Sequence, residues 1–135
     1  MGFLSELHRF SDWALLILRI GAGSVFLVHG LQKRGMWSVQ PSEQMPARMV
    51  NVLRALSIAE PLGALSVLGG LLTQLGAAGF IIVMVSAIRL KTAQMHKGFS
   101  DDGGWEIDFV LLTVATALLI LGAGRFSLDR LLLHP

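Results

Sequence analysis

The chain has 135 residues, of which 53% are hydrophobic and 15% charged, and its net charge is +2. Soluble domains carry about 25% charged residues, so this composition is typical of a single integral membrane domain, and with so small and scattered a charge we expect no nucleic-acid partner. The absence of cysteine excludes disulfides, thiol nucleophiles, cysteine-based zinc sites and iron–sulfur clusters held by this chain alone.

The N-terminal residues 2–10 combine apolar side chains with charges of both signs, which predicts a short helix at the membrane interface. Four apolar segments follow, and the first is long enough to cross a bilayer. We therefore expect one all-α domain over residues 1–135, an integral membrane four-helix bundle in contact with the lipid bilayer. Its helices are expected at about 13–31, 49–72, 75–96 and 107–123, with a tight turn at residues 73–74.

A soluble all-α bundle is the alternative, because the last two apolar segments are short enough to be buried helices of such a protein. Helices that are apolar on every face argue against it, since a small soluble bundle needs a polar side to each helix. Glycines within the segments, among them Gly63, Gly76 and Gly79, favour close packing of membrane helices, although glycine is common in such helices in any case.

Two charged residues lie deep in the first two apolar segments. Arg19 precedes Lys33 by about 21 Å of helix, and Glu60 follows Met49 by about 16 Å. Because consecutive helices run antiparallel, we expect Arg19 and Glu60 to form an ion pair near the bilayer centre. Pro61 removes a backbone hydrogen bond beside Glu60, which favours a cavity wall at this point. The alternatives are an ion pair that only fixes helix register and a kink that only serves packing.

Further polar residues gather where the helices are expected to reach one membrane surface. On the first and third helices they recur at helical spacings, so those of each helix share a face. We expect them to form a polar mouth above the ion pair; the alternative is interfacial anchoring by lysine, arginine and tryptophan. The predicted binding site therefore consists of Arg19, His29, Gln32, Lys33, Glu60, Arg89, His96, Trp105 and Glu106.

Other chemistry finds little support in the sequence. Two histidines could serve as axial ligands of haem in a four-helix bundle, but nothing beyond their number supports this. There is no two-histidine metal motif, no phosphate loop and no nucleophile–base pair, so we expect no metal site and assign no catalytic residue.

Four spaced blocks of sequence, taken together, resemble the DoxX family. They lie at residues 29–33, 60–74, 103–106 and 122–129 and cover nearly the whole chain in order. The resemblance implies a small four-helix membrane protein of bacteria or archaea, and hence a multi-pass protein of the bacterial inner (plasma) membrane. One departure is Gln74, where the family frequently has an arginine.

The same resemblance implies a function in redox chemistry. The name-giving relative resembles the membrane subunit of a terminal or thiosulfate:quinone oxidoreductase, and some members associate with soluble thiol-handling or superoxide-removing partners. We therefore expect an accessory or quinone-interacting subunit of a membrane redox system, with a soluble or membrane redox partner or further copies of itself. Two alternatives stay open: a non-catalytic scaffold that recruits soluble partners through its two long loops, and a small proton-coupled transporter that uses Glu60.

Overall fold

The structure is a computed structural model that describes residues 2–133, and every regular element in that range is helical. In chain order the elements are α1 (Gly2–Ser5), the 3-10 helix η1 (Glu6–Phe10), α2 (Ser11–Gln32), the 3-10 helix η2 (Lys33–Ser38), α3 (Ala47–Gly69), α4 (Thr73–Arg89), the π-helical turn η3 (Leu90–Gln94), α5 (Glu106–Leu121) and α6 (Leu128–Leu133). The predicted all-α fold class is confirmed.

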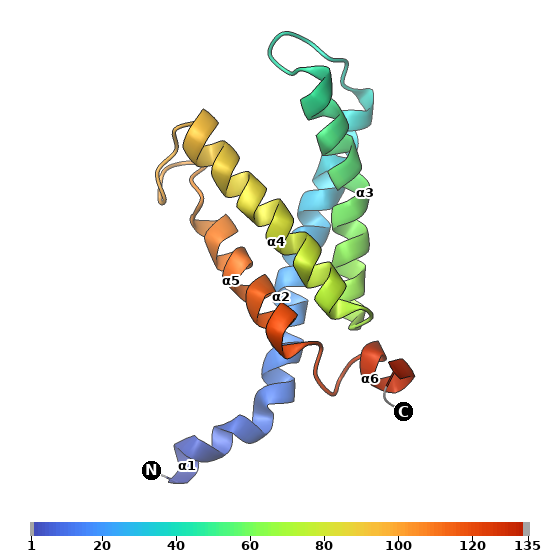
Figure 1. Ribbon diagram of the computed structural model, residues 1–135, viewed down its shortest axis with the longest axis vertical. Coiled ribbons are helices and arrows are strands. Elements are labelled where there is room, and N and C mark those ends of the chain that lie inside the picture. Colours follow the sequence, from blue (N-terminus) through green and yellow to red (C-terminus); the bar gives the residue numbers. More distant parts are fainter. Residues whose placement is uncertain (1, 134–135) are drawn as a thin grey trace.

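Two antiparallel hairpins make up the bundle. One consists of α2 and α3, the other of α4 and α5, and contacts of α3 with α4 and of α2 with α5 join them. Figure 1 shows the hairpins crossing near the end that carries α1 and α6 and diverging towards the opposite end, which carries the two long loops. We call these the termini end and the loop end.

Small residues and aromatic rings hold the hairpins together where they cross. The rings of Phe26 and Phe80 stack with their centroids 3.6 Å apart and their planes 6° from parallel. A methyl group on Gly63 would lie 3.0 Å from the Phe80 ring, and one on Gly76 would lie 3.0 Å from Val67. These glycines therefore let α3 and α4 approach closely, as small residues do in membrane bundles.

Large apolar side chains cover the outside of the bundle. Ile17, Leu75, Ile82 and Ile120 are between 66% and 73% exposed, as expected of side chains that face lipid. Within the described range, three helical stretches are long and apolar enough to cross a membrane, at residues 2–38, 47–69 and 73–94. The fourth bundle helix, α5, has 16 residues and extends about 24 Å, which is less than the hydrocarbon thickness of about 30 Å.

The turn between the hairpins differs from its prediction. We expected it at residues 73–74, but α3 ends at Gly69, Gly70 adopts a left-handed conformation with φ of 70°, and Thr73 is the first residue of α4. A methyl group on Gly70 would lie 2.5 Å from both the Arg19 guanidinium and the Ser127 side chain. Glycine at Gly70 is thus required by both the backbone and the space around it, and it ends α3 early.

Candidate functional site

Arg19 is buried at the termini end and is held by backbone carbonyls. The side chain is in α2 and only 1% exposed. Its Nε donates to the carbonyl of Val67 at 2.8 Å and its Nη2 to that of Leu68 at 2.8 Å. Its Nη1 donates to the carbonyls of Ala123 at 3.1 Å and Phe126 at 2.6 Å. Val67 and Leu68 lie in the last turn of α3, where helix carbonyls lack intrahelical partners; that of Val67 also accepts from the N–H of Gly70 at 3.2 Å, and Arg19 binds both.

The predicted ion pair between Arg19 and Glu60 is therefore wrong. Glu60 accepts a hydrogen bond from Nζ of Lys33 at 2.6 Å instead. The difference lies in the register of the hairpin. The expected depths of Arg19 and Glu60 assume that Met49 is level with Lys33. In the structure Lys33 lies opposite Glu60, thirteen residues beyond the start of α3 at Ala47.

The shift in register has a visible cause in the first loop. After α2 ends, η2 does not leave the bundle but continues in the direction of α2, alongside the first half of α3. Nε1 of Trp37 donates to Oγ of Ser57 at 2.9 Å, and the guanidinium of Arg54 donates to the carbonyls of Met36 and Val39. The side chain of Arg54 also lies 5.6 Å from the centroid of the Trp37 ring. As a result α3 extends well beyond the end of α2 (Figure 1).

The pair of Lys33 and Glu60 joins a partly exposed cation to a buried anion. The side chain of Lys33 is 25% exposed and that of Glu60 is 2% exposed. Glu60 lies in the middle of α3 and is followed directly by Pro61, through which the helix continues. Gly30 of α2 is buried against Pro61, and a side chain there would collide with the proline ring. The close approach at Gly30 thus brings Lys33, one turn later, within reach of Glu60.

Glu60 also borders an apolar groove between α3 and α4, which we call the α3–α4 groove. The groove has a volume of about 360 Å³. Its walls come from both helices and are glycine-rich: Ala59, Glu60, Leu62, Gly63, Ser66, Leu72, Leu75, Gly76, Gly79, Phe80 and Val83. A methyl group on Gly79 would meet nothing within 4 Å, so part of the space exists because that residue has no side chain. Glu60 is the one charged side chain in this wall.

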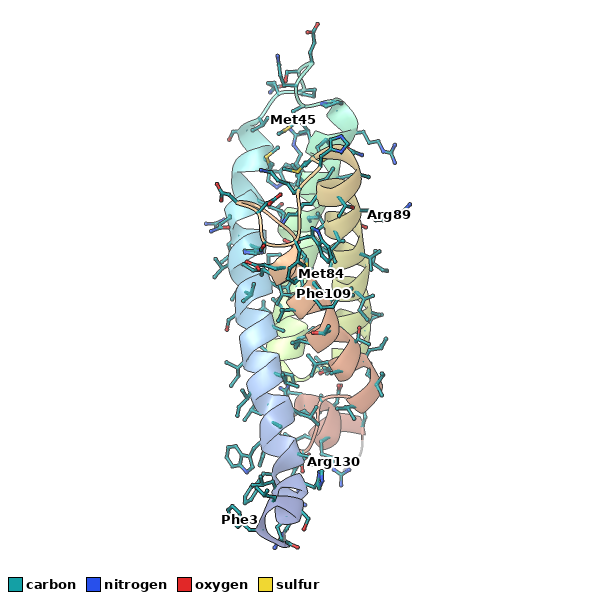
Figure 2. All side chains as sticks on the ribbon, turned by 90° about the vertical axis from the view of Figure 1, so that its left-hand side faces the viewer. Phe3, Met45, Met84, Arg89, Phe109 and Arg130 are labelled. Carbon is teal, nitrogen blue, oxygen red and sulfur yellow. The ribbon has the colours of Figure 1, made fainter. Side chains whose placement is uncertain are left out.

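The other predicted site residues are not brought together in the described structure. His29, Gln32, Arg89, His96 and Glu106 are all exposed. In Figure 2 Arg89 lies at the outer edge of α4, and the diverging hairpins separate its end of the bundle from that of α2. None of these five side chains lines the α3–α4 groove or the cavity at the termini end that is described below.

Trp105 belongs to an aromatic cluster of the second loop rather than to a pocket. Its ring is half-buried and meets that of Phe99 edge-on at 4.8 Å, and that of Phe109 at 6.1 Å. Near Arg89, the hydroxyl groups of Ser86 and Thr92 donate to carbonyls of the preceding helical turn, those of Ile82 and Ile88. These arrangements agree better with interfacial anchoring than with a polar mouth.

A second lysine–carboxylate pair was missed by the sequence analysis. Nζ of Lys91 donates to Oδ2 of Asp108 at 2.6 Å and to the carbonyl of Gly104 at 3.2 Å. Asp108 is 8% exposed and stands in the first turn of α5. The signal was an aspartate placed directly between Ile107 and Phe109, since a carboxylate among apolar residues needs a partner.

The block at residues 122–129 also has a definite role in the structure. Its carbonyls bind Arg19, and both oxygens of Asp129 accept from backbone N–H groups at the start of α4, those of Leu72 at 2.7 Å and Thr73 at 3.1 Å. Asp129 therefore caps α4 from a distant part of the chain. The block closes the termini end of the bundle.

Comparison with known proteins agrees with this architecture. A family model for DoxX matches residues 14–96, which is more than half of the chain and includes α2 from its second turn, α3 and α4. The chain belongs to the DoxX family. A relative from Bacillus subtilis (strain 168), named "Putative oxidoreductase CatD", is 30% identical over 118 residues, which cover 84% of this DoxX protein and 83% of the relative. No solved structure gives a significant match.

Proposed function

We propose that this DoxX protein is the membrane subunit of a redox system in the bacterial inner membrane, and that it binds an isoprenoid quinone in the α3–α4 groove. The observation that carries the proposal is the pair of Lys33 and Glu60, which connects a partly exposed ammonium group to a carboxylate at the wall of an apolar groove. The name of the Bacillus subtilis relative supports the redox class but says nothing of a quinone.

The groove suits a ligand that is largely apolar and has one polar end. Its volume of about 360 Å³ is near the lower limit for small-molecule sites, which is about 300 Å³, so it would hold a ring and the first part of a tail. Leu62 and Leu75 at the rim of the groove are 62% and 70% exposed. The rest of a quinone tail would therefore continue past them into lipid. Ring oxygens would face Glu60 as the charged group of the wall.

A quinone would supply the two-electron chemistry, taking up two electrons and two protons as it becomes a quinol. The chain contains no cysteine, and the electrons would come from a redox partner. Glu60 would hold a proton at the wall of the groove, and Lys33 would restore it, because its ammonium group is hydrogen-bonded to Glu60 and is itself 25% exposed. In this arrangement the two side chains form a short proton path from the loop end to the groove.

Native mass spectrometry of the detergent-extracted protein with a short-chain ubiquinone tests the binding site. Gly79→Leu adds a side chain whose Cβ has no other atom within 4 Å and which occupies space of the groove, so it should lower quinone retention about tenfold or more while the protein stays folded. Gly21→Leu is the matched control: a methyl group on Gly21 also meets nothing within 4 Å, but Gly21 is in α2 and does not line the groove.

The role of the ion pair has its own matched control. Glu60→Gln should weaken quinone binding or slow quinol formation by a reconstituted partner, whereas Asp108→Asn removes a carboxylate with the same 2.6 Å lysine contact outside the groove and should do neither. Equal losses of quinone retention in Gly79→Leu and Gly21→Leu would refute the α3–α4 groove as the quinone site. A protein that retains no quinone, yet captures a soluble partner stably, would support the scaffold alternative.

A further inference from the structure

A second cavity opens at the termini end, and we propose that it binds the phosphate group of an anionic phospholipid. We call it the termini-end bowl. It has a volume of about 560 Å³ and lies between the starts of α2 and α4, the end of α5, and α6. Its lining consists of Asp12, residues 72–75 and 121–125, Ser127, Asp129, Arg130 and Leu133. This site is separate from the pair of Lys33 and Glu60, although Leu72 and Leu75 border both cavities.

The charges of the bowl leave two cations available for a ligand. Its carboxylates are occupied by the fold, since Asp12 accepts from the backbone N–H of Arg125 at 2.8 Å and Asp129 accepts from those of Leu72 and Thr73. The guanidinium groups of Arg125 and Arg130, by contrast, bind no acceptor among residues 2–133. An oxyanion with several acceptor oxygens would provide hydrogen-bond acceptors for both guanidinium groups.

The backbone at both arginines is already fixed. The N–H of Arg125 is held by Asp12, and that of Arg130 donates to Oγ of Ser127 at 3.2 Å. Ser127 is 8% exposed, and the N–H of Asp129 donates to the carbonyl of Gly70 at 2.8 Å, which ties α6 to the turn between the hairpins. Binding would therefore order only the two side chains, which keeps the entropic cost of binding low.

One polar atom without a partner lies beneath the lining of the bowl. Thr73 lines the bowl but is completely buried, and its Oγ1 is the one buried side-chain oxygen or nitrogen in the described structure without a hydrogen-bond partner. A buried hydroxyl group without a partner is costly to the fold, but this oxygen is closed off from the bowl and is not a contact for the ligand.

The rim of the bowl decides in favour of a lipid over a soluble phosphate. Leu72, Leu75, Leu121 and Leu133 are between 55% and 70% exposed, and all four line the cavity. A soluble anion gains nothing from such a rim, whereas the acyl chains of a phospholipid would pack against it. The bowl is lined in part by α6 and lies at the same end of the bundle as α1, where lipid headgroups are expected (Figure 1; Arg130 is labelled in Figure 2).

The test uses the full-length protein, extracted and stripped of lipid, with dioleoyl phosphatidylglycerol added and bound lipid counted by native mass spectrometry. Phosphatidylglycerol should be retained in preference to dioleoyl phosphatidylcholine. Arg125→Gln/Arg130→Gln should lower its retention about tenfold. Arg34→Gln/Arg48→Gln is the matched control, because these arginines are also exposed but lie at the loop end. Arg130→Gln alone, a change in the exposed α6, should give a smaller loss and keeps the test valid if the double variant does not fold.

Three results would overturn the proposal. Equal retention of the two lipids would show that the phosphate charge is not recognised. Equal losses in both double variants would show general attraction to a cationic surface. Displacement of phosphatidylglycerol by an equal concentration of inorganic phosphate would identify a site for a soluble anion.

Discussion

The α2–α3 hairpin and the α4–α5 hairpin each hold a lysine–carboxylate pair with a nitrogen–oxygen distance of 2.6 Å. The surroundings differ. Asp108 stands in the first turn of α5, where the free N–H groups of the helix also favour a negative charge, and its lysine binds a backbone carbonyl as well. Glu60 stands in the middle of a helix, with no such help, beside a groove. The first pair fits a structural role at the start of α5, and the second is placed where chemistry could use it.

Loss of Arg19 should have the largest effect, because this side chain joins the two hairpins. Arg19→Gln removes a charged donor from four carbonyls, and each such bond contributes about 1.5–3 kcal/mol. We expect at least about 3 kcal/mol of destabilisation and little monodisperse protein by size-exclusion chromatography in detergent. Arg9→Gln, which changes an exposed arginine paired within η1, is the control and should be nearly neutral.

The variant Arg19→Gln/Glu60→Gln separates the observed contacts from the ion pair that we first expected. The two side chains share no partner, and Val67 lies seven residues beyond Glu60, about 10 Å along α3. Their effects on thermal stability should therefore add to within about 0.5 kcal/mol. Recovery of stability in the double variant would mean that Arg19 and Glu60 interact after all.

The two lysine–carboxylate pairs should differ in how much stability is lost when the carboxylate is removed. Breaking a fully buried pair costs about 3–5 kcal/mol, and since Lys33 is a quarter exposed we expect about 2 kcal/mol for Glu60→Gln. Asp108→Asn should cost about 1 kcal/mol, because asparagine can still accept hydrogen bonds at a helix start. Thermal unfolding in detergent measures both. An equal loss of stability in the two variants would remove the distinction between a structural pair and a pair at a site.

Asp129→Ala should have a smaller effect, confined to the start of the second hairpin. It frees the N–H groups of Leu72 and Thr73, and loss of such a cap costs about 1 kcal/mol. Hydrogen exchange should increase in the first turn of α4 and not in α3. Asp102→Ala, in the exposed second loop, is the control. Unchanged exchange at the start of α4 would contradict the capping role.

The smallest expected effect is a gain in thermal stability. Thr73→Val removes the buried hydroxyl that has no partner in the described structure, and in lipid-free protein this should raise stability by up to about 1 kcal/mol. Thermal unfolding before and after addition of phosphatidylglycerol measures it. A loss of stability in lipid-free protein would show that Oγ1 has a partner of its own.

The fold could be predicted because it depends on local properties of the sequence. The lengths of the apolar segments indicate membrane helices, and the spaced motifs led to the DoxX family. Helix ends were less certain, since the turn at Gly70 depends on its left-handed backbone and on space that Arg19 and Ser127 fill.

The site could be predicted only in its parts. The sequence indicates that Arg19 and Glu60 lie deep within apolar segments and need partners. Which partners they find depends on the register of α3 against α2. That distance is set by η2, through contacts of Trp37 and Arg54 that no periodicity reveals. Likewise, residues such as His29 and Arg89 can be assigned to a helix face from spacing, whereas the divergence of the hairpins follows from packing at Gly63 and Gly76.

The four carbonyls around Arg19 also bear on the order in which the protein is made. Arg19 is synthesised well before its acceptors, two of which lie 48 and 49 residues later and the other two 104 and 107 residues later. Until residues 123–126 have been synthesised, part of the guanidinium must remain hydrated, held by translocation machinery or drawn towards an interface, because a bare cation in hydrocarbon is costly. The helix α2 can therefore reach its final depth only after residues 123–126 have been synthesised.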